Sequence, residues 1–161
     1  MLRTQLLCTI CLSLCSIITA ANQLTDAVLP ATLRAHLQAE QFGLVTSIRG
    51  LPLGVRDAMQ TLFGGRLDIA EPGDRFQAGD VIVTLNLPIR RLVAAGCSVD
   101  HCLVYYEKGG IAHTRHVALF YWTPAATRFE WGGIAPSGLG TIDEVRKVIL
   151  SGGIKGPARF W

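Results

Sequence analysis

Two cysteines near the middle of the chain enclose the residues whose types could do chemistry, in the order Cys-Ser-Val-Asp-His-Cys. Their spacing fits neither the C-x-x-C of thioredoxin-like redox sites nor half of a four-ligand zinc site. In an exported protein such a pair forms a disulfide, so we predict a bond between Cys97 and Cys102. A rigid loop binds more tightly than a flexible one, so we predict Ser98, Asp100 and His101 as binding residues. The alternative is a bond that only staples the end of a hairpin.

A second set of polar side chains lies in the segment 111–122, which has the pattern of a long strand. Residues three apart in a strand point to opposite faces, so His113 and His116 should not share an ion, and we predict no metal site. Together with Arg115, these histidines mark the alternative position for an active site. The chain lacks a G-x-S-x-G motif, a P-loop and a dinucleotide fingerprint. We therefore expect binding rather than catalysis, and no cofactor.

Residues 1–21 have the pattern of a secretory signal peptide. Arg3 provides a positive start, residues 6–18 form an uncharged and mostly apolar run, and small residues follow. We predict cleavage near Ala20 or Ala21. The apolar run is shorter than the ~20 residues of a transmembrane helix, so we expect no stable membrane insertion after cleavage. The alternative is a lipid anchor on a cysteine of this segment, although a leucine precedes the last of them where a lipoprotein signal needs a small residue.

The remaining residues, 22–161, fit one domain of ordinary size. The formal charge of the chain is +3 and falls to +2 when Arg3 leaves with the signal. Basic residues are scattered along the sequence, which argues against the clustered basic face of a nucleic-acid binder. Three of the five cysteines also leave with the signal, so the mature protein keeps only the pair described above.

Apolar spacing predicts the elements that must position these residues. The segments 24–42 and 52–63 have helical spacing, and His36 should flank the apolar face of the first helix. A third helix should open with a capping box at Thr141 and Glu144. Strand-like runs occupy the segments 81–85, 89–95, 103–106, 111–122 and 127–131. We predict an α+β domain with an antiparallel sheet of about four to five strands and the helices packed on one face.

The cysteine loop and the segments beside it resemble the Ivy family of periplasmic inhibitors of C-type lysozyme. The likeness depends on the C-x4-C spacing with Asp100 and His101 inside it, on the hairpin that follows, and on a later strand that ends in Trp131. It spans about residues 89–131. The family has His before Asp in the loop, whereas this chain has Asp before His. The resemblance implies a helix-plus-antiparallel-sheet fold and a loop that inserts into the lysozyme cleft, where His101 would meet the catalytic carboxylates.

These observations together predict an exported periplasmic binding protein. Its expected partner is a lysozyme-like glycosidase or another protein of the cell envelope, contacted by the cysteine-closed loop. The alternative is an uncharacterised envelope protein or a small periplasmic enzyme with its site near His113, Arg115 and His116. A cavity beside those three residues, rather than at the cysteine loop, would favour the alternative.

Overall fold

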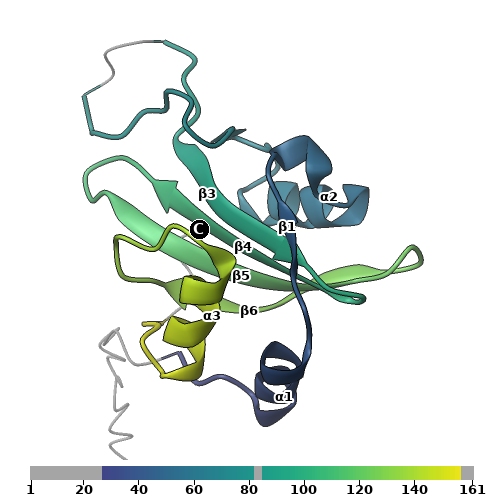
Figure 1. Cartoon of the computed structure of the whole chain (residues 1–161). Coiled ribbons are helices and arrows are strands. Elements are labelled where there is room, and N and C mark those ends of the chain that lie inside the picture. The colour runs from purple at the N-terminus through teal and green to yellow at the C-terminus, as the bar shows by residue number, and fades with distance from the viewer. Residues whose placement is uncertain (1–26, 82–84, 157–161) are drawn as a thin grey trace, which may run out of the picture.

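The computed structural model describes residues 27–81 and 85–156 (Figure 1). The predicted signal peptide, with its cleavage site near Ala20 or Ala21, lies outside these residues, as does most of the predicted strand 81–85. Within the described ranges, no helix is both long and apolar enough to span a bilayer.

The centre of the fold is an antiparallel sheet with five strands in the order β1-β3-β4-β5-β6. The strands are β1 (Gly43–Val45), β3 (Arg90–Cys97), β4 (His101–Lys108), β5 (Thr114–Trp122) and β6 (Thr127–Ile134). A two-residue strand, β2 (Ile69–Ala70), pairs with β3 in the parallel direction. Strands β3 to β6 form a meander in which each strand pairs with the next, and the predicted α+β class is confirmed.

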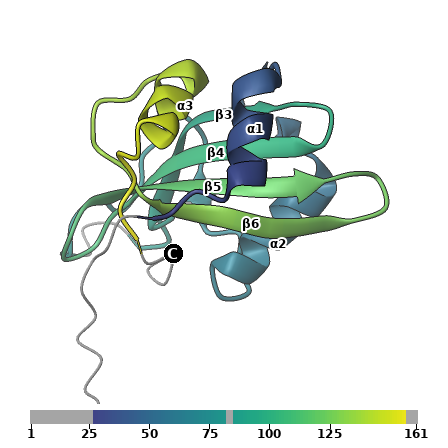
Figure 2. The same cartoon turned by 90° about the horizontal axis from the view of Figure 1, so that it is seen from below.

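Helices cover both faces of this sheet, as Figure 2 shows. They are α1 (Ala31–Ala39) and α3 (Ile142–Leu150) on one face and α2 (Leu53–Leu62) on the other. A short 3-10 turn (Ile48–Gly50) comes before α2. The prediction that all the helices pack on one face is therefore wrong.

The central strands explain why both faces need cover. On β4, Leu103 and Tyr105 point to the face of α1 and α3, whereas Val104 and Tyr106 point to the face of α2. All four residues are fully buried. Successive side chains of a strand lie on opposite faces, so the apolar run 102–106 of this strand would expose apolar area on any face without a helix. The apolar sequence of this strand thus requires a layer on each side.

The first helix is held on the sheet by residues late in the chain. Pro30 comes just before α1, and Leu33 and Leu37 bury its inner face. The Arg146 guanidinium of α3 donates hydrogen bonds to the main-chain oxygens of Leu37, at 2.6 Å, and of Glu40, at 3.0 Å. These carbonyls lie at the end of the helix, where intrahelical partners run out. The last turn of α1 is thereby fixed beside the β3–β4 hairpin.

Candidate functional site

A disulfide between Cys97 and Cys102 closes the hairpin that joins β3 to β4. The two cysteines are opposite each other in the sheet register, with their Cα atoms 4.0 Å apart. The main-chain N–H of Ser98 donates to the main-chain oxygen of His101 at 2.7 Å and completes the turn. Val99 is 92% exposed at the tip of this turn. The predicted disulfide and the small closed loop are therefore confirmed.

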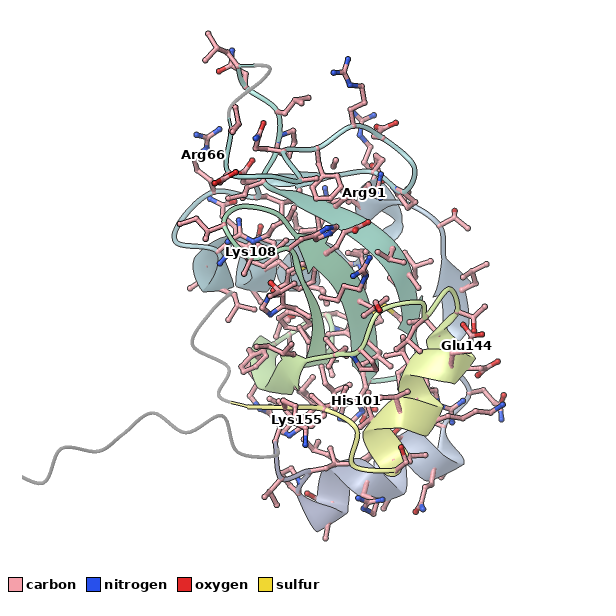
Figure 3. The ribbon with its side chains drawn as sticks, turned by 90° about the vertical axis from the view of Figure 1, so that its left-hand side faces the viewer. Arg66, Arg91, His101, Lys108, Glu144 and Lys155 are labelled. Atoms are coloured by element: carbon pink, nitrogen blue, oxygen red, sulfur yellow. A yellow bond between two sulfur atoms is a disulfide. The ribbon has the colours of Figure 1, made fainter. Side chains whose placement is uncertain are left out.

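The side chain of His101 points into the protein rather than out of the loop. The residue is 2% exposed, because it opens β4 and faces the side of the sheet that carries α1 and α3 (Figure 3). The centroid of its ring lies 4.5 Å from that of His36 and 5.9 Å from that of Tyr121. This burial contradicts the expectation that the loop presents His101 to a partner. The turn exposes Val99 and part of Asp100 instead.

Three carboxylates from three different parts of the chain surround the His101 ring. Its Nδ1 lies 2.7 Å from Oδ1 of Asp100 and 3.4 Å from Oε2 of Glu40, the residue that ends α1. Its Nε2 lies 3.3 Å from Oε2 of Glu130 in β6. Both ring nitrogens therefore face carboxylate oxygens, although a neutral imidazole can donate from only one of them.

Helix α1 contributes two residues to this group. His36 and Glu40 are four positions apart and so lie on the same side of the helix, where Nδ1 of His36 forms a hydrogen bond with Oε1 of Glu40. The hydroxyl of Ser98 donates to the other carboxylate oxygen of Glu40. Ser98, one of the predicted binding residues, thus joins the turn to the end of α1.

Four of these residues can direct one ligand atom each to a common point. The ligand atoms of His36, Glu40, Asp100 and His101 all lie within 4.8 Å of one another, and we call these four residues the His101 cluster. Two imidazole nitrogens with two carboxylate oxygens form a mixed set that suits Zn²⁺ and neighbouring first-row divalent ions. The cluster therefore has the chemistry of a metal site.

The charge around the His101 cluster favours a cation. Glu40, Asp100 and Glu130 supply three carboxylates, and the C-terminal end of α1 adds its partial negative charge. The opposing charges are Arg128, whose Nη2 lies 2.6 Å from Oε1 of Glu130, and Arg146, which bonds the carbonyls of α1. Arg128 is mostly exposed, so solvent and salt screen its charge. With neutral imidazoles, three carboxylates stand against two arginines, of which Arg128 pairs with a carboxylate and Arg146 with main-chain oxygens.

Glu130 carries a buried oxygen, Oε2, that accepts no hydrogen bond. The ring nitrogen Nε2 of His101 is 3.3 Å away but is not aligned for one. In metal sites, a ligating histidine commonly donates its second N–H to a carboxylate, which fixes the orientation of the ring. Glu130 is the carboxylate beside Nε2, and a small reorientation would let it accept that proton when Nδ1 of His101 is the ligand atom.

The alternative site is divided between the two faces of the sheet. His113 and Arg115 both approach Glu107, at 2.7 Å and 3.7 Å. Burial raises the pKa of Glu107, but hydrogen bonds from Arg91 and His113 outweigh burial, and the net result is a pKa below the usual value. His116 packs on the other face of the sheet, as the spacing of the two histidines predicts. The structure does not bring the three predicted residues together.

His116 is buried against Tyr106 on the α2 face. Their rings are stacked, with centroids 5.3 Å apart, and the Thr114 hydroxyl lies 2.8 Å from Nε2 of His116. Burial, together with the positive charges of Lys108 and Arg90, lowers the pKa of His116 to about 4. A cavity of about 440 Å³ opens beside this ring. Of the three residues of the alternative site, His116 alone lines that cavity.

Three residues that surround His101 are not among the site residues predicted from the sequence. They are His36, Glu40 and Glu130. The sequence predicts His36 only as a flank of an apolar helix face, and it does lie beside the buried Leu33 and Leu37. Its contacts with Glu40 and His101 are the feature that the sequence did not predict. The H-x-x-x-E spacing of His36 and Glu40 is the signal that could have found them, since it puts both on one side of a helix. Glu130 has no such signal, because its approach to His101 depends on the pairing of β4, β5 and β6. Ligand-type residues thus converge although the sequence predicts no metal site.

Comparisons of the chain with protein-family models, with curated proteins and with solved structures find no match. The chemistry and geometry of the His101 cluster are therefore the basis for assigning a function.

Proposed function

We propose that this protein is an exported binding protein whose ligand is a divalent metal ion of the zinc type, held by His36, Glu40, Asp100 and His101. The observation that carries the proposal is the approach of four ligand atoms to within 4.8 Å of one another beside a buried imidazole. Export is supported by the signal-peptide pattern of residues 1–21 and by the disulfide, a bond typical of oxidising compartments.

Two of the distances in the cluster are already near those of a bound ion, whereas the four ligand atoms together, now within 4.8 Å of one another, would have to contract around it. A tetrahedral Zn²⁺ with bonds of about 2.0–2.1 Å keeps its ligand atoms about 3.3 Å apart. Nδ1 of His101 is already 3.4 Å from Oε2 of Glu40, and it is 2.7 Å from Oδ1 of Asp100. Binding displaces the proton shared by His101 and Asp100 and widens that pair by roughly half an ångström.

One side of the cluster faces solvent. The side chains of His36 and Asp100 are 44% and 34% exposed, whereas His101 is buried. An ion can therefore enter between His36 and Asp100 without opening the sheet. On this side a water molecule or a donor from a partner protein can complete the coordination. A site of this form suits exchangeable binding better than permanent burial of an ion.

The ligand set also predicts which ions bind. Imidazole nitrogen suits Zn²⁺, Cu²⁺ and Ni²⁺, whereas Mg²⁺ and Ca²⁺ prefer sets made of oxygen alone. Ca²⁺ also takes six to eight ligands, and this cluster offers four side chains. We therefore expect tight binding of zinc and weak binding of calcium and magnesium.

Calorimetric titration of the oxidised, metal-stripped protein with Zn²⁺ tests the proposal. We expect one ion per chain and a loss of affinity of roughly a hundredfold in His101→Gln and in His36→Ala, because each removes a ligand. The matched control is His113→Gln, which removes a histidine that is also paired with a carboxylate but lies outside the cluster. This control should bind zinc as the wild type does.

Two results would overturn the metal proposal. One is a wild-type protein that takes up no zinc at micromolar concentration. The other is zinc uptake that falls as much in the His113→Gln control as in His101→Gln, since the ion would then be bound elsewhere. Titration with Ca²⁺ under the same conditions separates selective zinc binding from general attraction of cations.

A second candidate function is inhibition of a lysozyme-like glycosidase, favoured by the exposed tip of the closed loop. Val99 is 92% exposed on a turn fixed by the disulfide, so it and Asp100 would make the contact in place of His101. A lysozyme assay with micromolar protein tests this. Inhibition that is lost in Val99→Asp and kept in His101→Gln would support it, and no inhibition by the wild type would reject it.

A further inference from the structure

The Cys97–Cys102 disulfide encloses half of the proposed metal ligands. Asp100 and His101 both lie between the two cysteines. So does Ser98, whose hydroxyl donates to the α1 carboxylate of the cluster. The bond thus spans the one turn that links the ligands of the sheet to those of the helix.

The sulfur atoms themselves lie on the other side of the sheet. Cys102 is fully buried and packs with Val104 and Phe120 on the α2 face. His101, one residue earlier, faces α1, because adjacent residues of a strand point to opposite faces. The cysteines are therefore not ligands. They act on the metal site only through the backbone of the turn between them, as positioning residues.

We propose that this disulfide controls the affinity of the metal site, so that the oxidised protein binds zinc and reduction weakens the binding. The inference rests on the metal function proposed above. With the bond in place, Asp100 and His101 are set relative to each other before the ion arrives. Without it, metal binding must also order the ends of β3 and β4, and that ordering lowers affinity. We expect a loss of roughly tenfold, smaller than the loss of a ligand.

The reductant is a small dithiol or a protein with a paired dithiol. One of its thiolates attacks Sγ of Cys97, which is half-buried, while Cys102 is fully buried. A mixed disulfide forms, and the sulfur of Cys102 leaves as a thiolate and takes a proton. The second thiol of the reductant then displaces Cys97 in the same way. Two electrons and two protons pass to the protein, which ends with two thiols, and the reductant ends as a disulfide.

The experiment compares the zinc affinity of three samples by competition with a chromophoric chelator. They are the oxidised wild type, the wild type reduced with a phosphine, which leaves no added thiol to chelate zinc, and the double variant Cys97→Ser/Cys102→Ser. We expect the last two to bind zinc about tenfold more weakly than the first. Val99→Ala changes the same turn but keeps the bond, and it should bind as the oxidised wild type does.

The outcomes separate this inference from the proposed function. Equal affinity in all samples overturns redox control and leaves the metal site in place. No zinc binding by the oxidised wild type overturns the metal site itself. Tighter binding by the reduced wild type, but not by the serine variant, would make the thiolates ligands and also overturn the inference. Thermal unfolding of each sample shows whether it is folded. If the double variant is not folded, the zinc affinity of the reduced wild type alone tests the inference.

Discussion

His101 and His116 are equally buried histidines of one sheet with opposite surroundings. Each is 2% exposed, and they lie on the two neighbouring strands β4 and β5. His101 faces three carboxylates. His116 stacks on Tyr106 and is influenced by the positive charges of Lys108 and Arg90, with a pKa lowered to about 4.

The contrast shows that two equally buried histidines of one sheet can have opposite electrostatic surroundings. At neutral pH, His116 is uncharged, and its charged neighbours repel a cation. Around His101 the sign is reversed, and the end of α1 adds to the negative field. The signs of the neighbouring charges, set by which strands and helices meet, decide what each ring can bind.

The largest expected effect is the pH dependence of the free energy of unfolding that His116 causes. Its pKa is about 4 in the folded protein and about 6.5 in the unfolded chain, so between these pH values the folded protein binds fewer protons than the unfolded chain does. The stability that neutral His116 provides is present above pH 6.5 and is lost as the pH falls towards 4, by up to about 3 kcal/mol. Urea unfolding with EDTA from pH 7.5 to pH 4 should show this dependence, reduced in His116→Gln. An unchanged slope in the variant would assign the dependence to other groups.

Zinc should stabilise the folded protein by almost as much, and this gain should depend on His101 and not on His116. At a free concentration of one hundred times Kd, a ligand that binds only the folded state stabilises it by about 2.7 kcal/mol. Thermal unfolding with and without zinc should show this gain in the wild type and in His116→Gln. His101→Gln should show almost none of it. A gain lost equally in both variants would mean that the comparison between the two rings is wrong.

The carboxylate Glu107 lies near the other end of β4. It should contribute to the free energy of unfolding and not to metal affinity. Its side chain is 6% exposed and contacts Arg91, His113 and Arg115. Glu107→Gln leaves these groups without their anion, and we expect a loss of about 2 kcal/mol in the free energy of unfolding. Denaturant titration measures the loss. Zinc affinity that changes with this variant would contradict the separation of the two sites.

Glu130→Gln should have the smallest effect, and it should act on metal affinity alone. The amide can still approach His101, but it is a weaker acceptor for the second N–H of the ring. We expect roughly tenfold weaker zinc binding, measured by calorimetry, with little change in the free energy of unfolding. The matched control is Glu107→Gln, in which a carboxylate is replaced at the opposite end of the same face.

Features that depend on neighbours in sequence could be predicted. The capping box of α3 is present as expected: the Thr141 hydroxyl accepts from the N–H of Glu144 at 3.2 Å, and the Glu144 carboxylate accepts from the N–H of Thr141 at 3.0 Å. The Cys97–Cys102 bond is also confirmed. Both follow from residue types a few positions apart, which local chemistry fixes whatever the rest of the fold does.

Features that depend on which elements meet could not be predicted. Ser98 and Glu40 are 58 residues apart in the chain, and no spacing in the sequence indicates that their side chains touch. The inward direction of His101 is a further example, because a residue beside a cysteine in a short loop has the pattern of an exposed one. The wrong prediction of the helix layers has the same cause. The apolar stripe of α2 shows that one side of the helix is buried, but it does not show on which face of the sheet the helix packs.

Helix α1 is the first described element of the chain, and some contacts of the helix and of the residues just before it come from more than 100 positions away. Trp131 donates from Nε1 to the oxygen of Val28, 103 residues away, and Arg34 donates to the oxygen of Leu150, 116 residues away. Closing loops of this length costs chain entropy, and contacts of such separation slow folding. The strands β3 to β6 pair with their neighbours in sequence, so we expect this meander to form before α1 docks. Half of the proposed ligands come from α1, so metal binding would then report that α1 has docked on the sheet beside α3.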